Sequence, residues 1–131
     1  MKVEPLRMFS VLQILCLGIV LISINSCTHP GTPADQLPAV CFTGQVLPIF
    51  QNNCAISGCH SGSGGGHKGS LADYASIMRM ITPGNAANSQ AYKAMISTFQ
   101  LMPPKNALPM AQRELIRLWI DQGAKETTCG N

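Results

Sequence analysis

Residues 54–60 read CAISGCH, and the rest of the chain is best interpreted outward from this stretch. Cys54 and Cys59 are separated by four residues, and His60 directly follows the second cysteine. This order of residue types is typical of covalent attachment of a c-type haem. Two thiols form thioethers along one edge of the haem, and the adjacent imidazole can then bind the iron as its proximal ligand.

The length of the spacer sets a condition on the backbone. Haem-attachment motifs usually place two residues between the cysteines, whereas this chain has four. In an unbroken α-helix five positions turn the chain by about 500°, which puts the two thiols about 140° apart around the axis. We therefore expect the helix to end near Cys54 and the backbone to bulge. Gly58 suits such a bulge because glycine adopts backbone conformations that other residues avoid.

A six-coordinate haem also needs an iron ligand opposite His60. Met102 is the expected ligand, because two prolines follow it and stiffen the loop between the last two expected helices. A thioether favours Fe(II), so histidine–methionine ligation gives a raised potential that suits electron transfer. Met110, near the start of the last expected helix, is one alternative. His67 is the other, and histidine–histidine ligation would lower the potential.

Residues 1–26 have the anatomy of an export signal. Lys2 and Arg7 precede an apolar run over residues 8–24, which is short for a membrane-spanning helix. The run leads into INSC at residues 24–27, which resembles the lipobox of bacterial lipoproteins, where the cysteine is diacylated and becomes the new N-terminus. An uncleaved anchor helix is the alternative. We expect a lipoprotein signal peptide over residues 1–26, and lipid on Cys27 that holds the protein in the bacterial cell envelope, facing the periplasm.

Residues 27–39 are expected to form a lipid-anchored tether. The sequence THPGTPADQLP, residues 28–38, has three prolines, one glycine and no apolar periodicity. Fully extended, these 11 residues would reach at most about 40 Å. The remaining residues, 40–131, suit one compact domain.

The composition excludes several classes of function. Charged residues make up only 11% of the chain, which argues against a disordered polar chain or a basic nucleic-acid arm. After residue 26 there remain seven Lys or Arg and five Asp or Glu. The resulting net charge of about +2 is too small to indicate binding to the phosphate backbone of a nucleic acid, so no nucleic-acid partner is expected.

The cysteine count favours a second covalent link. Five of the six cysteines follow the signal. If lipid takes Cys27 and haem takes Cys54 and Cys59, then Cys41 and Cys129 remain near the two ends of the domain. In an oxidising compartment we expect these two to form a disulfide. Such a disulfide should contribute about 4–5 kcal/mol to the free energy of unfolding, because it lowers the conformational entropy of the unfolded chain.

Two other interpretations of the central motif stay open. In the first, Cys54 and Cys59 form a disulfide and His60 is an unrelated neighbour. In the second, these three residues bind zinc together with His67 or another cysteine. The zinc interpretation is weaker, because His67 lies in a glycine run and an exported compartment oxidises thiols.

The apolar pattern predicts short helices and no strand. We expect helices over residues 46–53, from a capping box at residues 70–73 to residue 80, from residue 88 or 89 to about 99, and over residues 110–122. Pro109 is expected in the first turn of the last helix, and Gly123 is expected to stop it. The residues expected to face inward are Val46, Leu47, Ile49, Phe50, Tyr92, Met95, Ile96, Leu115, Ile116, Trp119 and Ile120.

Three segments together resemble a known family. They are VLPIFQNNCAISGCHSG (46–62), MPP (102–104) and LIRLWIDQGA (115–124). The combination resembles the small c-type cytochrome domains of exported bacterial proteins. The four-residue spacer and the flanking Cys41 and Cys129 are most similar to lipoprotein versions from Bacteroidota, which are similar to the Planctomycete-type cytochrome c domains. The resemblance covers about residues 40 to 129.

The resemblance implies an all-α, class I cytochrome c-like fold, with about four short helices around one covalently bound haem c. The first and last helices would cross beside the haem, with Phe50 and Trp119 meeting at the crossing. The resemblance also implies that Cys54 and Cys59 carry the haem and that His60 and Met102 are its axial ligands.

The expected function is therefore a membrane-tethered monohaem cytochrome that relays single electrons. Its partners would be other redox proteins, docked transiently, and the membrane through its lipid. It is not expected to be an enzyme, because no nucleophile–base pair is evident. A haem-based sensor or gas-binding module is one alternative, and a non-haem, disulfide-stapled lipoprotein that acts as a binding scaffold is another.

Overall fold

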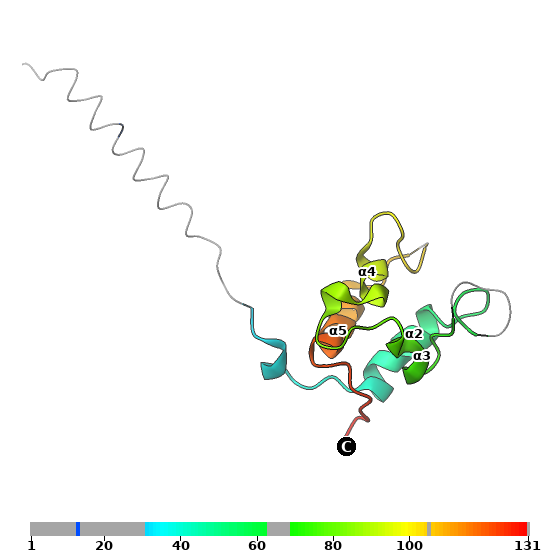
Figure 1. Ribbon diagram of the computed structural model, residues 1–131, viewed down its shortest axis with the longest axis horizontal. Helices are drawn as coiled ribbons and strands as arrows, with labels where there is room; N and C mark the ends of the chain where they lie inside the picture. Colours follow the sequence, from blue (N-terminus) through cyan, green and yellow to red (C-terminus); the bar gives the residue numbers. More distant parts are fainter. Residues whose placement is uncertain (1–12, 14–30, 63–68, 105, 131) are drawn as a thin grey trace, which may run out of the picture. The chain divides into compact units, whose positions relative to one another are not determined.

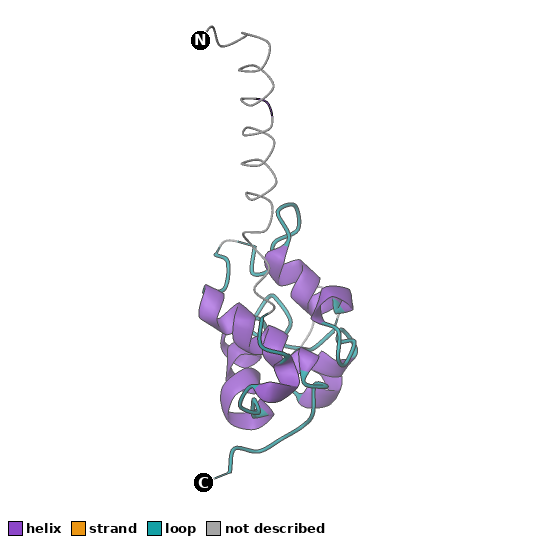
Figure 2. Cartoon of the chain, turned by 90° about the vertical axis from the view of Figure 1, so that its left-hand side faces the viewer, coloured by secondary structure: helices purple, strands orange, loops and turns teal. Residues whose placement is uncertain are grey.

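The computed structural model describes residues 13, 31–62, 69–104 and 106–130. The chain divides into two units, of which the second, Pro33–Asn131, contains the helices discussed below. The described residues form helices and turns without strands, so the all-α prediction is confirmed for them (Figures 1 and 2). Apart from residue 13, the predicted signal peptide lies outside the described residues, as do Cys27, the predicted site of lipidation, and His67, the alternative ligand.

The first helical segment begins earlier than predicted. A π-helical turn, η2 (Phe42–Val46), leads directly into α2 (Leu47–Asn53). Pro48 stands in the first turn of α2, where its missing N–H would have no partner inside the helix. The helix ends at Cys54, whose N–H still donates to the Phe50 carbonyl at 2.8 Å.

The second helix, α3 (Tyr74–Met78), begins at a capping box three residues later than predicted. The Asp73 carboxylate accepts the Ser76 N–H at 2.8 Å, and the Ser76 hydroxyl accepts the Asp73 N–H at 3.3 Å. The prediction of a box at residues 70–73 was wrong. The Ser70 hydroxyl accepts the Ala72 N–H at 3.2 Å instead, in a local turn that precedes the helix.

The third helix, α4 (Gln90–Ile96), follows a single 3₁₀ turn, η3 (Ala86–Asn88), and ends before the predicted residue 99. Ser97 is extended, and its hydroxyl accepts the N–H groups of Phe99 and Gln100 at 3.2 and 2.9 Å. This turn competes with a further helical turn. Ile96 consequently lies at the end of the helix with 48% of its surface exposed, and its predicted inward position was wrong.

The last helix, α5 (Met110–Asp121), matches its prediction closely. Pro109 occupies the N-cap position and no side chain caps the helix. Gly123 has φ +97°, a left-handed conformation that ends the helix at little cost for a residue without Cβ. Ile116, Trp119 and Ile120 are buried, whereas Leu115 is only partly buried.

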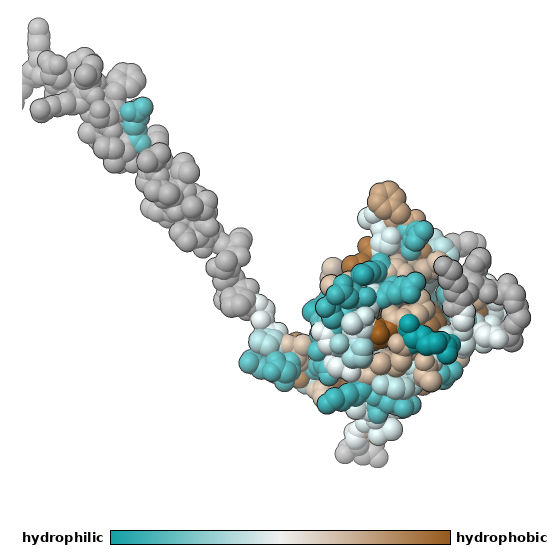
Figure 3. All heavy atoms as spheres, viewed as in Figure 1, coloured by the Kyte–Doolittle hydropathy of each residue, from teal (hydrophilic) through white to brown (hydrophobic). Residues whose placement is uncertain are grey.

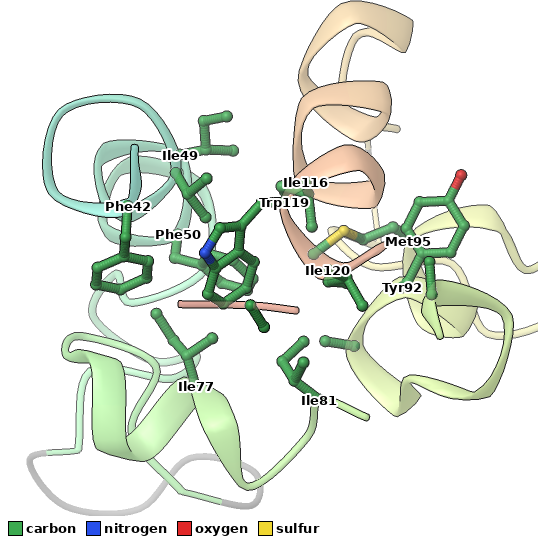
Figure 4. Packing of buried hydrophobic residues seen from close by; sticks show 14 of the residues in the cluster. Phe42, Ile49, Phe50, Ile77, Ile81, Tyr92, Met95, Ile116, Trp119 and Ile120 are labelled. Atoms are coloured by element: carbon green, nitrogen blue, oxygen red, sulfur yellow. The ribbon is translucent and has the colours of Figure 1, made fainter. Parts of the chain in front are cut away.

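The core gathers around Trp119 of α5 (Figure 4). The Phe42 ring lies 5.3 Å from the Trp119 ring between centroids, and it also packs edge-on against Tyr74 at 5.1 Å. Phe50 is fully buried in the same cluster as Trp119. The π-helical turn η2 therefore adds an aromatic contact to α5 that was not predicted.

The compact unit begins at Pro33, whereas a boundary at residue 40 was predicted. The amide of Gln122, just after α5, explains the difference. Its Nε2 donates to the carbonyl oxygens of Ala34 and Pro38 at 3.0 and 3.1 Å, and its Oε1 accepts the Val40 N–H at 2.9 Å. Part of the expected tether, including the 3₁₀ turn η1 (Ala34–Gln36), is thus bound to the domain.

A disulfide joins Cys41 and Cys129, the pair expected from the cysteine count. Their Cα atoms lie 5.2 Å apart across 88 residues of sequence. Gly44 lies directly against this bridge, because a Cβ at that position would collide with the Cys129 sulfur. The disulfide therefore closes the two ends of the domain over a small residue.

Candidate haem-attachment site

The CAISGCH segment forms a closed turn at the carboxyl end of α2. The His60 N–H donates to the Cys54 carbonyl at 3.0 Å, and the Cys59 N–H donates to the Ile56 carbonyl at 3.0 Å. These bonds return the chain to the end of the helix within six residues. The predictions that the helix ends near Cys54 and that the backbone then bulges are confirmed.

Gly58 has the backbone conformation that the bulge requires. Its φ of +79° lies in the left-handed region, which residues with a Cβ adopt only at a cost. A Cβ at this position would meet no atom within 4 Å, so the conformation and not the available space favours glycine here.

Both thiols of the turn are free in the structure and partly buried. Burial, followed by the nearby Cys59 thiol, raises the pKa of Cys54 from 9.0 to about 11. Cys54 is therefore a neutral thiol at physiological pH, in an apolar setting at the end of α2. The structure does not contain the alternative Cys54–Cys59 disulfide.

The His60 ring is oriented by a backbone carbonyl. Its Nδ1 lies 3.2 Å from the carbonyl oxygen of Gly69, and a carbonyl only accepts, so Nδ1 carries the proton. The other ring nitrogen, Nε2, then has a free lone pair and is suited to bind a metal. The His60 carbonyl in turn accepts the Leu71 N–H at 2.9 Å, so two hydrogen bonds connect this residue to the segment after the glycine run.

Met102 lies in the loop between α4 and α5. Its N–H donates to the Ala94 carbonyl at 2.9 Å, which fixes the backbone against α4. Met102 is 42% exposed, so it lies at the surface of the domain. Met110 is 72% exposed at the first residue of α5, where it was expected.

Several large apolar side chains at the end of α4 and on the loops after α2 and α4 are exposed to solvent. Figure 3 shows apolar surface at the top of the domain, where Figure 1 draws the loop after α4. Covering such side chains with an apolar group is favourable by roughly 25 cal/mol per Å². The exposed residues are Ile56 (46%), Ile96 (48%), Phe99 (96%) and Met102.

The described residues were also searched for a metal-binding group and for a membrane-spanning helix. Among them, no three His, Cys, Asp or Glu side chains are grouped so as to hold a metal ion. No helix among them is long and apolar enough to cross a membrane.

Gly69, the hydrogen-bond partner of His60, was not predicted from the sequence. The only local signal was the end of the glycine run, where Gly69 and Ser70 precede an apolar residue. A backbone acceptor has no side-chain signature, so its identity depends on how the chain returns toward the histidine.

Comparison of the chain with protein-family models, with curated proteins and with solved structures found no match.

Proposed function

We propose that this protein is a membrane-tethered monohaem c-type cytochrome, which carries single electrons between redox proteins in the bacterial cell envelope. The observation that carries the proposal is the closed turn from Cys54 to His60. It keeps two free thiols and one imidazole together, and the hydrogen bond to Gly69 leaves the imidazole Nε2 available as a ligand. This donor set matches what covalent haem attachment requires.

The residues fit the cofactor in distinct roles. Cys54 and Cys59 would hold haem through thioether bonds, and His60 and Met102 would bind the iron. When bound, haem supplies an Fe(III)/Fe(II) couple that exchanges one electron. The chain itself orients the imidazole through the Gly69 carbonyl, and its exposed apolar side chains would be available to pack against the haem.

The experiment that tests the proposal is expression in a host with c-type maturation machinery. It is followed by a haem stain after denaturing electrophoresis and by a pyridine haemochrome spectrum. The expected result is haem that stays with the denatured chain. The matched control is a Cys54→Ser/Cys59→Ser double variant, which should lose the haem, whereas Gly58→Ser keeps both thiols and should retain part of it.

Absence of covalent haem from a competent host would overturn the proposal. The chain would then be treated as a disulfide-stapled lipoprotein that binds another protein. Covalent haem with rapid CO binding to the reduced form would retain the haem but replace electron transfer with a gas-binding role.

A further inference from the structure

Arg79 is held in a defined place at the end of α3. It is the C-cap residue of this helix, with helical backbone angles of −63° and −18°. The next residue, Met80, donates its N–H to the Ile77 carbonyl at 2.9 Å, and its own carbonyl accepts the Ala91 N–H at 3.1 Å. Hydrogen bonds on both sides of Met80 therefore fix the backbone from which the Arg79 side chain extends.

The guanidinium of Arg79 lies beside the segment that orients His60. A Cβ built on Gly69 would stand 3.7 Å from Nη2 of Arg79. The carbonyl oxygen of the same glycine lies 3.2 Å from Nδ1 of His60. A positive charge thus lies next to the residue that holds the proposed iron ligand.

This charge has no carboxylate partner in the described part of the chain. The ion pairs found there are both made by Arg117, to Glu114 and Asp121. Asp73, at the other end of α3, uses its carboxylate to cap the helix. The Arg79 side chain is exposed, and its guanidinium therefore has hydrogen-bond donors available for an anion.

The cofactor of the proposed function carries two carboxylates that no residue assigned above would bind. We infer that Arg79 binds a haem carboxylate and raises the reduction potential of the iron. This inference rests on the proposed function, because a haem bound by His60 would lie close to Gly69, whose carbonyl holds the imidazole ring. The planar guanidinium of Arg79 is suited to bind a haem carboxylate, because it can donate two parallel hydrogen bonds to the two carboxylate oxygens.

The effect on the potential follows from Coulomb's law. Oxidation to Fe(III) adds one positive charge, which a nearby guanidinium disfavours. Replacing Arg79 by glutamine removes that repulsion and should raise the Fe(III):Fe(II) ratio, measured at the wild-type midpoint potential, by about three- to tenfold. For a one-electron couple, tenfold corresponds to about 59 mV.

The test compares Arg79→Gln with Lys93→Gln in the full-length holoprotein. Both changes remove one exposed cation, but Lys93 lies on α4 and makes no contact with Gly69. Redox titration should show the threefold or larger change only in R79Q, and Arg79→Lys should recover part of it. The infrared difference spectrum between the two redox states should show haem carboxylate bands displaced in R79Q and not in K93Q.

A potential and carboxylate bands in R79Q that match those of K93Q would overturn the assignment. Far-ultraviolet circular dichroism checks that both variants fold, and R79K provides the measurement if R79Q does not. The haem stain separates the two hypotheses. Stained R79Q with an unchanged potential refutes the role of Arg79, whereas an unstained wild-type chain refutes the cytochrome itself.

Discussion

The Nδ1 atom of His60 lies 3.2 Å from the carbonyl oxygen of Gly69, so a bond across nine residues of sequence sets the orientation of the imidazole. The acceptor belongs to a glycine with φ +83°, a conformation that turns the carbonyl in a direction that other residues reach only with strain. The hydrogen bond makes Nδ1 the donor and leaves Nε2 free to bind a metal, and metal-binding histidines usually donate their other ring N–H in this way.

Gly69→Ala should weaken this hydrogen bond. An alanine with left-handed backbone angles costs roughly 1–2 kcal/mol, and the chain relieves the strain by rotating the carbonyl. We expect a lower unfolding midpoint and a changed ¹⁵N shift of His60 Nδ1. The matched control is Gly84→Ala, since Gly84 has a similar φ of +76° and a Cβ there meets no atom within 4 Å. An equal ¹⁵N shift change in both variants would contradict the role of Gly69.

Met102→Ala in the holoprotein should abolish the methionine–iron charge-transfer band and lower the reduction potential, because a thioether stabilises Fe(II). Met110→Ala serves as the control, since Met110 is 72% exposed at the start of α5. The absorption spectrum of the oxidised protein is the measurement. Loss of the band in M110A, with the band intact in M102A, would move the ligand assignment to Met110.

The pH dependence of the haem-free, reduced domain should depend on Cys54. Burial raises the pKa of this thiol from 9.0 to about 11, so the folded state favours the protonated form. The resulting stability is fully present below pH 9 and is lost as the pH rises through about 11. Urea unfolding at pH 8 and at pH 11 should show the loss in the wild type. Cys54→Ser should flatten the dependence and Cys59→Ser should largely retain it, and identical pH profiles in the two variants would contradict this origin.

The Cys41–Cys129 disulfide should contribute about 4–5 kcal/mol to the free energy of unfolding, since it closes a long loop in the unfolded chain. A Cys41→Ser/Cys129→Ser double variant should therefore unfold at a clearly lower urea concentration. Gly44→Ala should also destabilise the domain, because the added Cβ collides with the Cys129 sulfur. A reducing agent should remove much of the difference between wild type and the double variant. An unchanged urea midpoint in the double variant would show that the bridge adds nothing.

The sequence predicted the boundaries of some helices more accurately than those of others. The boundaries of α5 were predicted well, because an apolar stripe lies between Pro109 and Gly123 and both residues restrict the backbone strongly. The start of α3 and the end of α4 were misplaced. The hydroxyl groups of Ser70 and Ser97 each accept backbone N–H groups in a local turn. Such a turn is an alternative to capping a helix, as at Ser70, and to continuing one, as at Ser97.

Side chains with distinctive chemistry were identified from the sequence, and so was the local backbone that they require. Cys54, Cys59 and His60 lie in one turn, Gly58 has the positive φ that the four-residue spacer demands, and Cys41 is bonded to Cys129. These features could be predicted because each depends on residue type and short-range geometry.

The tertiary structure decided which distant groups meet. It placed the Gly69 carbonyl against His60, the Phe42 ring against Trp119, and the Gln122 amide against the segment after Pro33. A backbone carbonyl looks the same in every residue, and several aromatic or amide side chains can fill a similar position. Only the path of the folded chain selects among such equivalent partners, because each contact forms where packing brings the two groups within bonding distance.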